Sequence, residues 1–420
     1  MKQKLGFMAL MVLAFLLAAA PGYSANTQEL ERKIDLLADE VDDLKSRGIG
    51  AGTSDHNRVS VHGYGEMHFN RTTQERGSTQ IDNHRFVIGV HALLTDWIHL
   101  NAEIDFEHAA QELEFEFAHL DFLLSPGLNA RAGVMLAPVG LLNEFHEPNL
   151  FWTSERPLLQ SRMIPTSWSA GGVGLFGTPM EGVNYRLYAM NSLQSITKDS
   201  TANGNGSGGN GGSGDSFGTN GIRGGRKQVN GAIADDWSVY ARVEFTKLLP
   251  GLQVGFSLVN GDTTHNIISA DGNMTLLEAD IQYRREWFDM NASIVNTHVE
   301  DAREMNKFCA SAPSANSCSG GIAENNFGFN VQAGVHLPQL MGWKTSHDIV
   351  PHFMFERVRT QDEMPAGTDP DKSKNRDAVY TFGVAYLPTP EVALKVDHTH
   401  TMLQDNTSTD QFNMAIAYMY

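Results

Sequence analysis

Apolar and polar residues alternate along most of the chain after residue 57. Between residues 98 and 107 every second residue is Ile, Leu, Ala or Phe, and the residues between them are His, Asn, Glu or Asp. Residues 237–245 and 327–337 show the same alternation. A period of two puts the apolar side chains on one face of a strand and the polar side chains on the other. The pattern therefore predicts an all-β protein.

This alternation predicts about sixteen strands within residues 58–420. In the fourth strand the alternation changes phase near Phe117 and Ala118. The predicted spans are 58–70, 84–94, 97–108, 113–124, 128–136, 171–177, 182–191, 236–246, 251–260, 274–285, 288–299, 324–337, 345–358, 377–387, 391–400 and 410–420.

The predicted connections alternate between long and short. The short ones contain turn residues, such as Pro126-Gly127 and Pro250-Gly251, and 109–112 is short where a long connection is expected. Tight turns on one rim and long loops on the other are typical of barrels that span a bacterial outer membrane. The long connections are predicted at 71–83, 137–170, 192–235, 261–273, 300–323, 359–376 and 401–409.

In lipid the edges of such a sheet would leave N–H and C=O groups unpaired, at several kcal/mol each. We therefore expect the first and last strands to pair, which gives a closed antiparallel transmembrane β-barrel. One face of the last predicted strand carries Phe412, Met414, Ile416, Tyr418 and Tyr420.

The first 57 residues follow other patterns. Residues 1–25 combine Lys2 and Lys4 with an apolar core and small residues, which predicts a secretory signal peptide; an uncleaved membrane anchor is the alternative. Residues 26–47 carry apolar side chains at spacings of four and three, which predicts a short coiled-coil helix or an amphipathic helix lying on the chain's own body. Residues 48–57 form a Gly-rich linker.

Composition narrows the choice of partners. A formal net charge of -18 argues against nucleic acid. Export would place Cys309 and Cys318 in an oxidising compartment, where they can form a disulfide; a reduced, inert pair is the alternative. The histidines considered as metal ligands are His62, His68, His398 and His400. No Cys or carboxylate set completes a site with them, so we expect no metal site there. We also expect no cofactor and no catalytic triad.

Sixteen strands, a short coiled coil, a long third outer loop and a terminal aromatic residue resemble the trimeric bacterial outer-membrane porins, and among them the phosphate-selective porin O/P-like group. Tyr420 departs mildly from that group, whose members more often end in Phe. The resemblance implies a homotrimer assembled through barrel walls and the 26–47 helix, set in outer-membrane lipid with this helix in the periplasm. It also implies passive diffusion of small polar or charged solutes.

The third outer connection, 137–170, is unusually apolar for a loop. It contains ten Leu, Phe, Ile and Trp residues, so it should not project into water. In porins the third loop folds into the lumen and narrows it, and we expect the same here; packing at a subunit interface is the alternative. Its candidate constriction residues are Glu144, Glu147, Glu155, Arg156 and Arg162.

Charged residues also fall on the inward register of the strands. A set of arginines facing loop carboxylates would create a transverse field; the alternative is that these charges only pair with one another. The candidate wall residues are Arg131, Arg186, Arg242, Arg284, Glu103 and Asp105. Because inward acids outnumber inward bases and no Lys cluster is present, the sequence favours weak selectivity, slightly for cations, over phosphate specificity.

Other functions stay open. The channel could take up an oxyanion or an organic acid, because four Arg in one ring would outweigh distant carboxylates. A structural sheath or envelope tether is another possibility, although a sheath should need more strands.

The Gly/Asn/Ser-rich residues 204–225 predict a mobile outer loop rather than a phosphate cradle.

Overall fold

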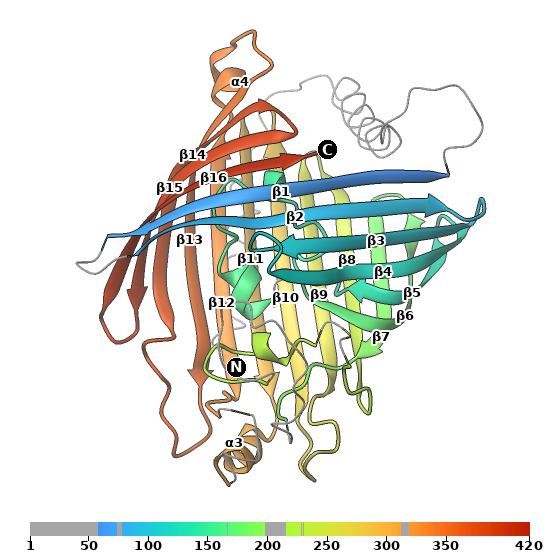
Figure 1. The fold of residues 1–420 in the computed structure, drawn as a ribbon, viewed down its shortest axis with the longest axis vertical. Helices are drawn as coiled ribbons and strands as arrows, with labels where there is room; N and C mark the ends of the chain where they lie inside the picture. Colours follow the sequence, from blue (N-terminus) through green and yellow to red (C-terminus); the bar gives the residue numbers. More distant parts are fainter. Residues whose placement is uncertain are drawn as a thin grey trace. The chain divides into compact units, whose positions relative to one another are not determined.

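The structure, a computed structural model of the chain, describes residues 58–73, 78–165, 167–197, 216–227, 229, 231–311, 318 and 320–420. The predicted signal peptide, helix and linker, 1–57, lie outside the described residues. Sixteen strands form one closed antiparallel barrel, in which each strand pairs with its neighbours in sequence and β1 pairs with β16 (Figure 1). The predicted fold class, including closure and strand number, is confirmed.

Each of the sixteen predicted strands has a counterpart in the barrel. The strands are β1 (Val59–Thr72), β2 (Thr79–Leu93), β3 (Ile98–Glu107), β4 (Glu112–Ser125), β5 (Leu128–Leu136), β6 (Ser169–Met180), β7 (Val183–Asn191), β8 (Trp237–Leu249), β9 (Leu252–Asp262), β10 (Asn273–Arg285), β11 (Phe288–Val299), β12 (Asn325–Val335), β13 (Asp348–Glu363), β14 (Arg376–Thr389), β15 (Val392–Leu403) and β16 (Ser408–Met419). The short helices are η1 (Pro148–Leu150), η2 (Leu159–Met163), η3 (Arg223–Gly225), α3 (Ala302–Ser311) and α4 (Leu337–Met341).

The two faces of the wall differ in polarity. Outward side chains are apolar and exposed, for example Ile81, Phe256 and Phe382, at 72%, 46% and 55%. Many inward side chains are charged and buried, such as Arg242 and Asp280. This is the arrangement of a barrel whose outer face contacts lipid acyl chains.

The pairing of β1 with β16 closes the wall. The Gly63 N–H donates to Tyr420 O (2.9 Å), and the Tyr420 N–H donates to Gly63 O (2.8 Å). A Cβ on Gly63 would lie 2.1 Å from Val87 O and 2.7 Å from the Tyr420 hydroxyl oxygen, so only glycine fits this contact. The terminal tyrosine thus packs across the seam between β16, β1 and β2.

Several strand pairs have register shifts, and two of these β-bulges, in β2 and β4, bear on the interior. In β4 the pairing with β3 shifts so that Glu116 is the extra residue, which explains the phase change at Phe117 and Ala118. In β2 the pairing with β1 shifts at Met67, and His84 is the extra residue. A bulge re-aims side chains locally, and both bulges place a polar residue among the inward groups.

The connections follow the predicted sorting with four corrections, of which the first is that 401–409, predicted as a long loop, is only the short turn 404–407 between β15 and β16. Residues 71–83, predicted as a long loop, are mostly strand, because β1 and β2 stay paired as far as Arg71 and Thr79. The turn after β12 is longer than predicted because it contains α4, which lies at the opposite end of the barrel from α3 (Figure 1). In the described part of 204–225, Phe217 and Ile222 are buried, so the predicted mobile loop is wrong for residues 216–225.

Among the described residues, no helix is long and apolar enough to cross a membrane.

The polarity of the two faces predicts that an introduced arginine destabilises the barrel much more on the outward face than on the inward face. Phe256→Arg places a charge on the outward face near the middle of β9, and we expect it to lower the free energy of unfolding by about 2–4 kcal/mol. Gln253→Arg, on the inward face of the same strand, should change it by under about 1 kcal/mol. Urea unfolding in phospholipid vesicles measures both, and equal losses would contradict the assignment of faces.

Candidate functional site

The connection between β5 and β6, residues 137–168, forms the centre of the candidate site. Hydrogen bonds close its neck: the Ala137 N–H donates to Trp168 O (2.7 Å), and the Asn143 amide donates to Ala137 O (2.7 Å) and Trp168 O (3.0 Å). Leu159 and Ile164 are fully buried. We call residues 137–168 the lumen loop, because its polar partners lie on the inner face of the wall.

The first anchor of the lumen loop is His146. Its Nε2 atom lies 2.8 Å from the Tyr64 hydroxyl of β1 and is also hydrogen-bonded to Glu116 of β4. Ser167 Oγ donates to the second oxygen of Glu116 (2.9 Å). Burial lowers the pKa of His146, but the neighbouring Glu116 carboxylate has the larger opposite effect. The pKa of His146 therefore lies above its ordinary value. The bulge in β4 is what brings Glu116 to this contact.

The second anchor is Glu155, which accepts hydrogen bonds from His68 Nδ1 (3.0 Å) and Asn70 Nδ2 (2.7 Å) of β1. Burial raises the pKa of Glu155, but these bonds lower it below its usual range. His68 also bonds Glu66 (2.9 Å), and Glu66 pairs with Arg85 of β2 (2.9 Å). The lumen loop is therefore attached to a buried charge network on β1 and β2.

The third anchor is Lys395 of β15, which is 2% exposed. Its ammonium donates to Pro148 O (2.5 Å) and Thr153 O (3.1 Å) and lies 4.1 Å from the centre of the Phe151 ring. Next to it, Asp397 accepts from the Ser154 N–H (2.5 Å).

On β13, Glu356 accepts the N–H groups of Leu158 (3.1 Å) and Leu159 (2.9 Å) at the start of η2. The lumen loop is therefore fixed to β1, β4, β13 and β15.

Apolar side chains fill part of the interior. The alternation pattern had predicted polar side chains on the whole inner face, so this feature was not expected. Inward residues at the outer ends of β7 to β13 are apolar and buried, and side chains of the lumen loop, of 192–236 and of 300–324 pack on them. The inward members are Tyr188, Met190, Tyr240, Val259, Met274, Leu276, Val295, Val299 and Val358. The change from apolar to charged inward residues is visible in the sequence of β10, where Met274 and Leu276 lie on the same face as Glu278 and Asp280.

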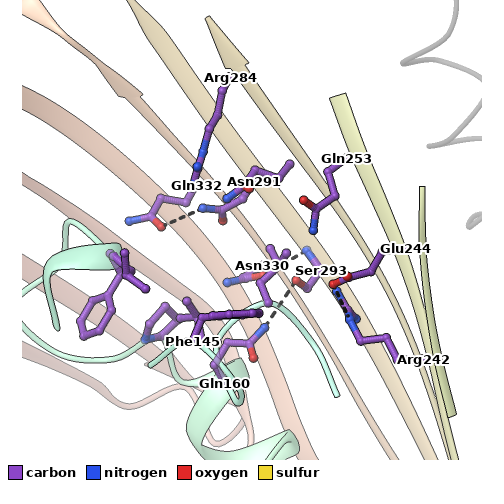
Figure 2. Close-up of a pocket in the computed structure, with 16 residues that line it drawn as sticks. Phe145, Gln160, Arg242, Glu244, Gln253, Arg284, Asn291, Ser293, Asn330 and Gln332 are labelled. Carbon is purple, nitrogen blue, oxygen red and sulfur yellow. Dashed lines mark hydrogen bonds and ion pairs between the residues drawn. The ribbon is translucent and has the colours of Figure 1, made fainter. Parts of the chain in front are cut away.

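A cavity of about 250 Å³ lies between the lumen loop and the inner wall (Figure 2). On the loop side Phe145 and Leu150 are 50% and 48% exposed. On the wall side most of the lining is neutral and hydrogen-bonding: Gln253, Gln282, Asn291, Ser293, Asn330 and Gln332. The cavity thus has one apolar side and one amide-rich side, which suits polar solutes that carry some apolar surface. The sequence analysis did not single out these amides.

Three of the four predicted wall arginines are paired with carboxylates. Arg131 makes a two-pronged pair with Asp121 (2.6 and 3.0 Å). Arg242 contacts Glu244 (2.9 Å), Glu278 (3.3 Å) and Asp280 (2.7 Å).

Arg186 pairs with Glu244 of the wall and with Glu144 of the lumen loop, each at 2.9 Å. Arg284 differs, because its side chain is 60% exposed and its nearest carboxylate, Asp289, is 3.9 Å away. Of the four, Arg242 and Arg284 line the cavity.

The other predicted site residues are spread over the interior. Glu103 and Asp105 do not line the cavity; Asp105 lies 4.0 Å from Arg85, and Glu103 lies 3.7 Å from His62. Glu147 directly precedes η1, and Arg156 donates to His146 O (3.4 Å). Arg162 lies in the last turn of η2.

Sequence reasoning overlooked Tyr64, Arg85, Glu116, His146 and Lys395, although the phase change in β4 marked Glu116 indirectly. In a separate outer connection, Cys309 of α3 is disulfide-bonded to Cys318.

Comparisons with known proteins agree with this architecture. No protein-family model matches the chain. An uncharacterised protein of Aquifex aeolicus is 28% identical over 369 residues, covering 86% of this chain and 80% of that protein.

Solved structures of similar fold are outer-membrane channels. They include Salmonella typhi OmpF in complex with daunomycin (10% identity, 86% of this chain and 97% of that chain, TM-score 0.53) and an anion-selective porin from Comamonas acidovorans (10%, 86% and 99%, 0.53). The outer membrane channel DcaP of Acinetobacter baumannii is similar too (11%, 88% and 100%, 0.51). At these identities the likeness establishes a shared barrel fold.

The anchors predict that the lumen loop loosens when Lys395 is replaced. Lys395→Met leaves two buried carbonyl groups without a donor, at about 1–3 kcal/mol each, so protease cleavage within 148–156 should become faster. Lys307→Met on the exposed side of α3 is the control and should leave cleavage there unchanged. Digestion of the folded protein followed by mass spectrometry identifies the sites; an uncut loop in Lys395→Met would contradict this role.

Proposed function

We propose that the protein is a porin of the bacterial outer membrane that forms a water-filled channel for passive diffusion of small polar or charged solutes. The observation that carries this proposal is the cavity between the lumen loop and the amide-rich wall, inside a closed barrel with an apolar outer face. A barrel of sixteen strands is wide enough to leave an aqueous passage. The lumen loop would act as its constriction.

The proposal extends to location and assembly. Residues 1–25 would direct export, and residues 26–47 would lie in the periplasm and join barrels into a homotrimer. Trimeric assembly is supported by one solved structure of similar fold, a trimer form of OmpT from Vibrio cholerae (10% identity, 86% of this chain and 99% of that chain, TM-score 0.51). The 137–168 segment would then serve the pore rather than the subunit interface, because its anchors are inward side chains.

Weak charge selectivity is supported by the pairing of the wall charges. Arg131, Arg186 and Arg242 are each held by carboxylates, so their fields largely cancel at a distance. Around the cavity Arg284 is the most open charge, and the remaining wall side chains there are mostly neutral amides. Such a lining discriminates by size and hydrogen bonding more than by charge.

A second candidate function, uptake of an oxyanion or organic acid, is favoured by a group of loop arginines. Arg223 donates to Ser161 O (3.0 Å), and burial together with Arg226, Arg162 and Arg156 lowers the pKa of Arg223 to about 9. Glu107 and Glu114 lie close enough to Arg226 to act on it electrostatically, and Glu107 also acts on Arg223, but burial is the largest influence on both guanidinium groups. Guanidinium groups are well suited to bind carboxylate or phosphate oxygens.

The channel proposal is tested by reconstituting the purified protein in a planar lipid bilayer. A trimeric porin should give stepwise conductance increases in groups of three, and a sheath or tether should give none. Absence of conductance from correctly folded protein would overturn the proposal.

The loop arginines predict a change in ion preference. Replacing Arg162, Arg223 and Arg226 together by Gln should shift the reversal potential in a KCl gradient toward that of K⁺, because three cationic groups on or beside the lumen loop are removed. Arg285→Gln, which removes a charge from the outward face, is the control and should not shift it. An unchanged reversal potential in the triple variant would exclude the oxyanion candidate and leave the weakly selective channel.

A further inference from the structure

A group of histidines and carboxylates lies where the short outer connection between β3 and β4, residues 108–111, meets the wall. His108 Nδ1 is 2.8 Å from Asp82 Oδ2, and His84 Nδ1 is 3.4 Å from the same oxygen. The ligand atoms of these three residues lie within 4.8 Å of one another. All three residues are half-buried, so solvent can reach them.

We propose that Asp82, His84 and His108 form a binding site for one divalent transition-metal ion such as Zn²⁺ or Ni²⁺. Two imidazoles and one carboxylate, with water in the open position, are a common ligand set for such ions. In a tetrahedral site with bonds of about 2.0–2.1 Å, neighbouring ligand atoms are about 3.3 Å apart. The observed separations of 2.8 and 3.4 Å bracket this spacing, so binding needs only small side-chain movements.

The backbone departs from regular geometry at both places that supply the imidazoles. His84 is the extra residue of the bulge in β2, and its ring stacks on His68 of the inner wall at 4.7 Å between centroids. In a regular strand Asp82 and His84 share one face and Arg85 lies on the other. The bulge lets Asp82, His84 and Arg85 all lie on the inner side of the wall, where His84 stays next to Asp82.

The second departure is in the 108–111 connection. His108, Ala109 and Ala110 all have left-handed backbone, with φ of 49°, 57° and 67°. Left-handed backbone is unfavourable for residues other than glycine, and strained backbone of this kind is concentrated at functional sites. The His108 N–H donates to His84 O and the Ala109 N–H to Asn83 O, both at 3.2 Å, which fixes the connection against β2 and directs His108 toward Asp82.

More acidic groups surround the same imidazole. Glu107, His108 and Glu112 form a second set whose ligand atoms lie within 4.8 Å of one another. These carboxylates add negative potential around the site and favour a cation there. A bound ion would join the outer connection to β2 next to the His68–Glu155 anchor of the lumen loop.

The site is tested by isothermal titration of untagged protein in detergent with ZnCl₂ and NiCl₂. We expect one ion per chain, binding weakened at least tenfold in each of Asp82→Asn, His84→Gln and His108→Gln, and unchanged binding in His298→Gln, an exposed histidine of β11 bonded to Asn325. MgCl₂ should not bind at this site, because imidazole favours transition metals.

Far-UV circular dichroism of each variant confirms that the barrel is folded before titration. Absence of Zn²⁺ and Ni²⁺ binding by the folded wild type, or equal affinity in the wild type and the three variants, would overturn the proposal. The titration measures binding without ion flow, so its outcome is independent of the channel proposal.

Discussion

Backbone hydrogen bonding in a lipid environment is the constraint from which the structure follows. Strand N–H and C=O groups need partners on neighbouring strands, since lipid offers none. The Gly63–Tyr420 hydrogen bonds complete this pairing between the first and last strands. Once the wall is closed, the period of two has a single consequence: alternate residues face lipid or the interior. Sixteen strands then enclose more space than their own inward side chains fill, which leaves room for a loop and for solvent.

The space inside the barrel is filled partly by packed apolar side chains and partly by buried charged groups. Apolar loop residues and inward apolar residues at the outer ends of β7 to β13 bury one another, as in the core of a soluble domain. The remaining contacts of the lumen loop are ionic or hydrogen-bonded, to Glu116, Glu356 and Lys395 among others. Truncating one member of such a buried network leaves its partner unsatisfied, so the lumen loop is held in one position.

The ion pairs of the wall also determine the ion selectivity of the channel that we propose. Wall arginines bonded to carboxylates contribute little net field, and the cavity lining is dominated by amides and by the Phe145 side of the loop. Any charge selectivity of the proposed channel would therefore depend on Arg284 and on the loop arginines near Arg223 more than on the paired arginines of the wall.

Sequence patterns predicted the strands and the two faces because alternation is a local property of the chain. They predicted an apolar third loop for the same reason. The partners of the lumen loop could not be predicted, since Tyr64, Glu116 and Lys395 are brought together only by closure and by the bulge in β4. The group at Asp82 was overlooked because three left-handed residues, not a sequence motif, bring His108 to Asp82 and His84.

Labelling of single cysteines in proteoliposomes tests the central claim, that water fills the inner side of the wall and lipid covers the outer side. Cysteines would be placed at Gln253 and Gln282, which line the cavity, and at their strand neighbours Val254 and Ile281 on the opposite face. The account predicts that a charged, water-borne thiol reagent modifies the first pair and leaves the second pair unmodified. Similar modification of all four positions would contradict it.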